Sequence, residues 1–182
     1  MDTQAVKQFC QQHTDASVVP ALMDYMRVPN QSPAFDADWA TNGLQEQALQ
    51  VITGWIDAQE VQGLAYRVVT KDGLTPLLIV EIASFQCDSD DSVLMYGHFD
   101  KQPPLDQSLW NDGLSPHEPV LKDGKLYGRG GADDGYSIFA AITAITAVQK
   151  HGGSHKRIVI LCESAEESAR EDLDIYLRVH SF

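Results

Sequence analysis

The sequence has few cysteines and no long apolar run, and each shortage excludes a class of protein. Its three cysteines, Cys10, Cys87 and Cys162, are odd in number, widely spaced and without a CxxC pair. This spacing argues against a disulfide framework and suits a reducing compartment. Because no run of about 18 apolar residues occurs, the sequence predicts no membrane-spanning helix.

Basic residues are also scarce, with 13 Lys+Arg against 26 Asp+Glu and a net charge of −13. No basic cluster could neutralise phosphates, so nucleic acid and anionic membranes are poor partners. The acidic excess is compatible with metal binding, but solubility explains it equally well. The start, "MDTQAVKQFCQQHTD", is too polar for a signal peptide, and we expect a cytoplasmic protein.

The apolar residues that are present, within 43% hydrophobic residues, follow the periods of helices and strands. Helices are expected over residues 3–27, 38–60, 135–149 and 171–179. Strands are expected over residues 63–70, 76–83, 92–97 and 157–162. The alternation predicts one α/β domain, with a mixed β-sheet flanked by helices. Sites in such sheets lie beyond the carboxyl ends of strands.

The first candidate site segment is "YGHFD", where His98 and Asp100 follow the strand expected at 92–97. An H-x-D pair suits a metal site, because the carboxylate can orient the imidazole and raise its basicity. By itself the pair is also typical of a structural histidine capped by a nearby aspartate.

The second segment is "GRGGADDG", in which Asp133 and Asp134 enter a helix. Its glycines allow a tight turn and close approach to a ligand. Either aspartate could instead be an ordinary helix N-cap. The dinucleotide fingerprint G-x-G-x-x-G fails here, because Asp133 stands three positions after Gly130. The sequence therefore disfavours a nucleotide-binding domain.

The third segment is "LCESAEES", with Glu166 and Glu167 beyond the strand expected at 157–162. Adjacent side chains at a strand exit point in different directions, so the two glutamates could have different roles. A solvated acidic turn is the alternative. Together the three segments supply His, Asp and Glu, the ligands that zinc and manganese accept. Water between two such metals can be deprotonated to attack a carbonyl, with help from a base that is not a ligand.

The stretches "YGHFDKQPP", "SPHEPVLKDGKLYGRGGADDG" and "ESAEES" resemble the M20 metallopeptidases, especially their carnosinase-like dipeptidase branch. Acetylornithine deacetylases and succinyl-diaminopimelate desuccinylases are relatives with the same centre. The three motifs stand in the family's order, with positions 98, 133 and 167 separated by 35 and 34 residues. The similarity extends from about residue 20 to residue 177.

This resemblance implies a role for each site residue. His98 would bind one metal, Glu167 would bind the other, and Asp133 would bridge both. Asp100 would be the carboxylate behind His98, and Glu166 would be the general base or acid. The implied cofactors are two Zn²⁺, with Mn²⁺ or Co²⁺ as alternatives. The implied substrate is a small peptide or an N-acyl amino acid, cleaved at its amide bond.

The chain departs from the family's pattern at several positions. Relatives commonly read "DDKG", with a cis bond between the two aspartates, but this chain lacks the lysine after Asp134. Relatives read "EGxEExGS", whereas this chain has Ser164 and Ala169 in place of the two glycines. Loss of the first glycine could crowd the metal-facing backbone.

The resemblance also implies that residues 1–182 are the N-terminal portion of the M20 catalytic domain. The C-terminal part of that domain and the lid and dimerisation domain would be absent, although the full-length form would be a homodimer. Each metal would keep two protein ligands, and His180 is not expected to replace a missing one. We expect a truncated, inactive chain, with metals absent or partly bound. We also expect an unpaired sheet edge or an apolar face, which would lead either to self-association or to an altered C-terminal packing that hides it. The alternative is a non-catalytic binding or regulatory remnant of the same fold.

Overall fold

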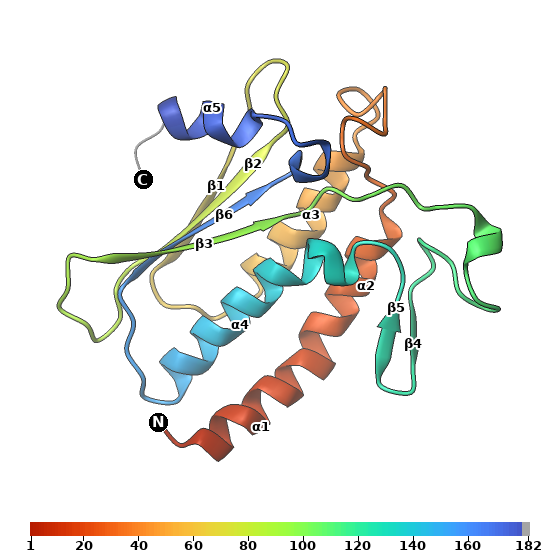
Figure 1. The fold of residues 1–182 in the computed structure, drawn as a ribbon. Coiled ribbons are helices and arrows are strands. Elements are labelled where there is room, and N and C mark those ends of the chain that lie inside the picture. The colour runs from red at the N-terminus through yellow and green to blue at the C-terminus, as the bar shows by residue number, and fades with distance from the viewer. Residues whose placement is uncertain (180–182) are drawn as a thin grey trace.

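A computed structural model describes residues 1–179, and its ribbon shows one sheet with helices on both faces (Figure 1). His180 lies outside the described residues. The helices are α1 (Thr3–His13), α2 (Val19–Arg27), α3 (Leu44–Asp57), α4 (Tyr136–Lys150) and α5 (Asp172–Val179). The strands are β1 (Leu64–Val69), β2 (Leu77–Ile82), β3 (Ser92–His98), β4 (Val120–Lys122), β5 (Lys125–Tyr127) and β6 (Arg157–Glu163).

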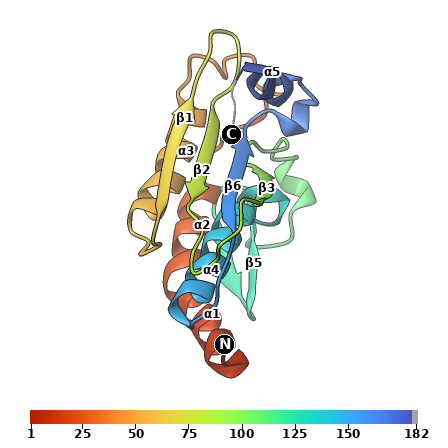
Figure 2. The same ribbon diagram turned by 90° about the vertical axis from the view of Figure 1, so that its left-hand side faces the viewer.

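Four of the strands form one sheet in the order β1-β2-β6-β3, which Figure 2 shows from left to right. β2 pairs antiparallel with both β1 and β6, whereas β3 pairs parallel with β6. β4 and β5 form a separate antiparallel hairpin. The sheet is mixed and flanked by helices, so the predicted fold class is confirmed.

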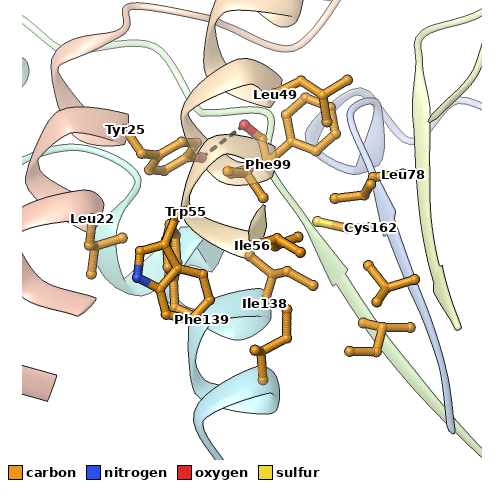
Figure 3. Packing of buried hydrophobic residues seen from close by; sticks show 14 of the residues in the cluster. Leu22, Tyr25, Leu49, Trp55, Ile56, Leu78, Phe99, Ile138, Phe139 and Cys162 are labelled. Atoms are coloured by element: carbon orange, nitrogen blue, oxygen red, sulfur yellow. Dashed lines mark hydrogen bonds between the residues drawn. The ribbon is translucent and has the colours of Figure 1, made fainter. Parts of the chain in front are cut away.

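The larger part of the core lies between the sheet and helices α2, α3 and α4. Figure 3 shows Trp55 of α3 against Phe139 of α4, with ring centroids 4.8 Å apart in an edge-to-face arrangement. The opposite face of the sheet is covered by α5, whose Tyr176 packs with Leu77, Ile79 and other strand residues. No helix within residues 1–179 has the length and apolar character needed to cross a bilayer.

The helix expected at 38–60 begins later than its apolar spacing predicts. Residues before α3 form turns, in which Asp36 accepts a hydrogen bond from the side chain of Asn42 at 2.7 Å. Gly43 then takes a left-handed conformation with φ +74°, which glycine adopts without steric cost. The helix expected at 3–27 is present as α1, a π-helical turn at Thr14–Val18, and α2.

The expected open edge is present at β3, which pairs only with β6 among the described strands. Leu94 and Tyr96 of this edge strand are 66% and 50% exposed. Met95, between them in sequence, packs against the main core. Leu94 and Tyr96 therefore point to the opposite face of the sheet, where α5 packs but leaves these two side chains exposed. An exposed apolar edge strand is a template for pairing with another chain.

We predict that Leu94→Glu weakens self-association of the chain. Losing a Leu side chain that association buries costs about 1.5–3 kcal/mol, so the dissociation constant should rise about tenfold or more. The free energy of unfolding should change by no more than about 0.5 kcal/mol, because Leu94 is exposed. Sedimentation velocity across a concentration series measures the association. Leu121→Glu, at an exposed site on β4, is the matched control. A wild-type chain that stays monomeric throughout the series would contradict the prediction.

Candidate metal centre

The site segments meet at the edge of the sheet where the parallel strands β3 and β6 end. His98 stands opposite Glu163 in the register of this pair, and the Phe99 N–H donates to the carbonyl oxygen of Glu163 at 2.8 Å. Because the two strands run in the same direction, the loops that follow them leave side by side. The "HFD" and "SAEES" segments are thereby brought together, although they lie more than 60 residues apart in sequence.

The "GRGGADDG" loop reaches the same edge through the turn Gly131–Gly135 that begins α4. Asp134 accepts a hydrogen bond from the His98 backbone N–H at 3.2 Å through its Oδ2. Gly97 permits this approach, because a Cβ there would lie 2.1 Å from Oγ of Ser137. The Asp133–Asp134 peptide bond is cis, in agreement with the resemblance.

His98 is buried, and its ring nitrogens face carboxylates on two sides. Nδ1 lies 3.2 Å from Oδ1 of Asp100, and Nε2 lies 3.4 Å from Oδ1 of Asp133. Nε2 is also 3.7 Å from Oε2 of Glu166. Burial has the largest single effect on the pKa of His98 and lowers it, whereas contact with Asp100 raises it. With the charges of Asp134 and Glu166 added, the pKa rises to about 9.

Asp100 joins two of the site loops. Its side chain is fully buried, with Oδ1 directed at His98 and Oδ2 accepting a hydrogen bond from the Glu167 backbone N–H at 3.0 Å. The sequence predicted only the contact with His98. The second contact means that one carboxylate orients the imidazole and also holds the glutamate loop.

Glu166 and Glu167 point to different surroundings, as expected for adjacent residues after a strand. The Glu166 side chain is 46% exposed beside His98. Glu167 is partly buried and accepts a hydrogen bond from the side chain of Gln102. Burial raises the pKa of Glu167, and the charge of Asp133 raises it further against the effect of Gln102. Its Oε1 is buried and has no hydrogen-bond partner within residues 1–179.

Three of the five predicted residues form a group that fits a cation. His98, Asp133 and Glu167 each offer a ligand atom, and these atoms all lie within 4.8 Å of one another. One imidazole nitrogen and two carboxylate oxygens are a donor set that Zn²⁺ accepts. The unpartnered Oε1 of Glu167 fits the same interpretation, because a buried carboxylate oxygen normally has a partner.

Sequence reasoning missed two residues of the site. Glu163 is buried and accepts a hydrogen bond from the hydroxyl of Tyr96 at 2.7 Å. Burial and the charge of Asp100 raise the pKa of Glu163. The second missed residue is Gln102, whose side-chain amide donates a hydrogen bond to Glu167. A usable signal was present, because both residues lie within the "YGHFDKQPP" and "ESAEES" stretches.

The expectation that Ser164 crowds the site is wrong. Ser164 is fully buried, but its hydroxyl donates to the carbonyl oxygen of Pro76 at 2.9 Å, at the start of β2. The second lost glycine has a local effect instead. Ala169 takes φ +49°, in the left-handed region that favours glycine.

Comparison with known proteins supports the assignment of these segments. Residues 94–175 match the model of peptidase family M20/M25/M40. An uncharacterized metallohydrolase of Methanocaldococcus jannaschii is 27% identical over 155 residues, covering 81% of this chain and 36% of that protein. A cysteinylglycine-S-conjugate dipeptidase of Corynebacterium striatum is 34% identical over 82 residues, covering 44% of this chain and 17% of that protein.

The fold agrees with a solved structure of human carnosine dipeptidase 1, with a TM-score of 0.68 and 23% identity over 97% of this chain. The aligned part is 37% of that protein, so the chain spans about a third or less of the length of these relatives. The matched residues contain all three site segments, from His98 to Glu167. Residues 94–175 are therefore similar to peptidase family M20/M25/M40.

Proposed function

We propose that this chain is part of a metal-dependent hydrolase that cleaves the amide bond of dipeptides or N-acyl amino acids at a dinuclear centre. The observation that carries the proposal is the convergence of His98, Asp133 and Glu167, whose ligand atoms lie within 4.8 Å. The match to peptidase family M20/M25/M40 supports hydrolysis, and the relatives include a dipeptidase and succinyl-diaminopimelate desuccinylases, which are named for amide substrates.

The proposed ligand assignment follows the resemblance to the M20 metallopeptidases, and the closeness of the three donors supports it. His98 would hold one metal through Nε2, Glu167 would hold the second, and Asp133 would contribute a carboxylate oxygen to each. Bound divalent ions, two Zn²⁺ or alternatively Mn²⁺ or Co²⁺, would supply Lewis acidity that polarises a carbonyl and lowers the pKa of a water. Asp133 suits the bridging position because its carboxylate is 64% exposed and stands 3.4 Å from Nε2 of His98.

The remaining two residues would orient groups and move protons. Asp100 faces Nδ1 of His98, which fixes the ring with Nε2 turned toward the other carboxylates. Glu166 would be the general base and acid, because its exposed carboxylate can accept a proton from water and return it to the leaving amine. No hydrogen bond to the Glu166 side chain occurs within residues 1–179, so the carboxylate is free to take either role.

We further propose that residues 1–182 by themselves hydrolyse peptides poorly. The assignment gives each metal two protein ligands, whereas catalytic zinc sites normally have three. The missing ligands and substrate contacts would come from further parts of a longer protein, for which the resemblance implies a homodimer. The three cysteines are free and widely spaced, which suits a reducing, cytoplasmic setting.

Metal binding tests the ligand assignment directly. We expect the chain to bind Zn²⁺, and His98→Ala, Asp133→Ala and Glu167→Ala each to weaken binding. The loss of zinc affinity should be larger than the roughly 10–100-fold loss that follows removal of a hydrogen-bond partner of a metal ligand. Equilibrium dialysis with metal analysis measures stoichiometry and affinity. Asp90→Ala, within the acidic run at 88–91, is the matched control for general charge. Equal losses in Asp90→Ala and the three site variants would refute the assignment.

A peptidase assay with added Zn²⁺ or Mn²⁺ tests the prediction of low activity. We expect dipeptide hydrolysis by residues 1–182 near the background, because each metal lacks a ligand. Glu166→Ala should then make no difference. Robust hydrolysis that disappears in Glu166→Ala would refute the prediction of low activity and would support the role of Glu166. Robust hydrolysis that survives Glu166→Ala would contradict both.

The pH dependence of metal binding follows from the raised pKa of His98. A metal binds only the neutral imidazole, so below a pKa of about 9 binding must displace a proton. The apparent affinity should rise about tenfold per pH unit from neutral pH and level off near pH 9. Calorimetry in buffers of different ionisation enthalpy should detect release of about one proton at pH 7. A flat pH profile without proton release would contradict metal binding by a His98 whose pKa is raised.

A further inference from the structure

Residues 28–34, "VPNQSPA", connect α2 to the turns before α3 and lie against two of the site loops. None of these residues belongs to the proposed metal ligands or catalytic residues. Asn30 and Ser32 are nevertheless fully buried, although both are polar. Buried polar side chains normally have hydrogen-bond partners, and the partners here indicate what the segment does.

One end of the segment is held by Lys101, which directly follows Asp100. Lys101 is fully buried, and its ammonium donates to the carbonyl oxygens of Tyr25 at 3.0 Å and Val28 at 2.7 Å. A third hydrogen bond goes to Oδ1 of Asn30. The three N–H groups of the ammonium are therefore all used, which offsets the cost of burying a charge. The ammonium also lies 3.8 Å from the centroid of the Tyr25 ring.

Asn30 accepts a hydrogen bond from Lys101 and also donates one to the His98–Lys101 loop. Its Nδ2 donates to the carbonyl oxygen of Phe99 at 2.8 Å, one residue after His98. The hydroxyl of Tyr25 donates to the same oxygen at 2.8 Å, as the dashed line in Figure 3 shows. The position of residues 98–101 is thus fixed by groups from α2 and the 28–34 segment.

The other end of the segment holds the glutamate loop. The Ser32 N–H donates to the carbonyl oxygen of Lys101 at 3.0 Å. The Ser32 and Ser168 hydroxyls are hydrogen-bonded to each other at 2.5 Å, and the Ala34 N–H donates to Oγ of Ser168 at 2.7 Å. Ser168 directly follows Glu167, so the segment spans from the residue after Asp100 to the residue after Glu167.

The same buried groups also lie under the third loop. A Cβ at Gly130 would come 2.5 Å from Cε of Lys101, and one at Gly135 would come 2.2 Å from Cε1 of Tyr25. The backbone that carries Asp133 therefore rests on the two side chains that hold the 28–34 segment.

We propose that the 28–34 segment positions the glutamate loop against the His98–Lys101 loop, with Lys101, Asn30, Ser32 and Ser168 as positioning residues. Its consequence for metal binding rests on the function proposed above. The turn Glu166–Ser168 has only three residues and is followed by Ala169 in a left-handed conformation, so local hydrogen bonds alone hold it weakly. The serine pair supplies a fixed point next to Glu167.

Amide hydrogen exchange of the metal-free chain, resolved by residue, tests the positioning role. Ser32→Ala should speed exchange of the Glu167 and Ala169 amides about fivefold, the effect of losing one hydrogen bond. Ser168→Ala should speed exchange more, because it also removes the acceptor of the Ala34 N–H. The double variant should show little more than Ser168→Ala alone, because that substitution already removes the contact with Ser32. Ser17→Ala is the matched control. The Ser17 hydroxyl accepts a hydrogen bond of 2.9 Å from the Trp55 indole N–H, at a position far from the site. Additive effects, or unchanged exchange at Glu167 and Ala169, would overturn the proposal.

Zinc affinity provides a second readout and separates this proposal from the proposed function. If the wild-type chain binds Zn²⁺, Ser32→Ala should weaken binding by about 10-fold or more, as loss of a supporting partner does. Zinc binding that is unchanged in Ser32→Ala would overturn the positioning role. If the wild-type chain binds no Zn²⁺, the metal assignment fails, and the exchange result decides the positioning role alone. The serine substitutions carry the test because Lys101→Met would leave three buried acceptors unpaired and could prevent folding.

Discussion

The site depends on the parallel pairing of β3 with β6, which sets His98 opposite Glu163. Parallel neighbours end at the same edge of a sheet, so a histidine after one strand and a glutamate pair after the other must meet there. The turn Gly131–Gly135, which precedes α4, packs against β3 and adds Asp133. Residues from three distant segments therefore converge because of strand direction.

The second constraint is electrostatic. Asp100, Asp133, Asp134, Glu163 and the two adjacent glutamates surround a single imidazole. Burial and neighbouring negative charge raise the pKa values of Glu163 and Glu167, and the same charges hold His98 in its protonated form to about pH 9. Carboxylates crowded in this way repel one another, and a bound cation would relieve that repulsion. The excess of negative charge is thus consistent with the metal role proposed for these residues.

Much of the fold and of the candidate site could be predicted from the sequence. The strands were predicted from their apolar runs. The site segments were predicted from their chemistry and from their resemblance to the M20 metallopeptidases, whose motif order positions 98, 133 and 167 share. The start of α3, the direction of the Ser164 hydroxyl and the second hydrogen bond of Asp100 could not be predicted. Each depends on a turn geometry or on a partner distant in sequence, such as Pro76 for Ser164. Local pattern carries no information about such partners.

The position of β6 also bears on how the chain acquires its structure. β6 comes last in sequence among the strands of residues 1–179, yet it lies between β2 and β3, which both fall within residues 77–98. The sheet cannot close until residue 163 has been synthesised, and β2 and β3 remain without their shared neighbour until then. Such nonlocal pairing slows folding and leaves apolar strands exposed until β6 has paired. The glutamate loop follows β6 directly, so the site cannot form before β6 has paired with β3.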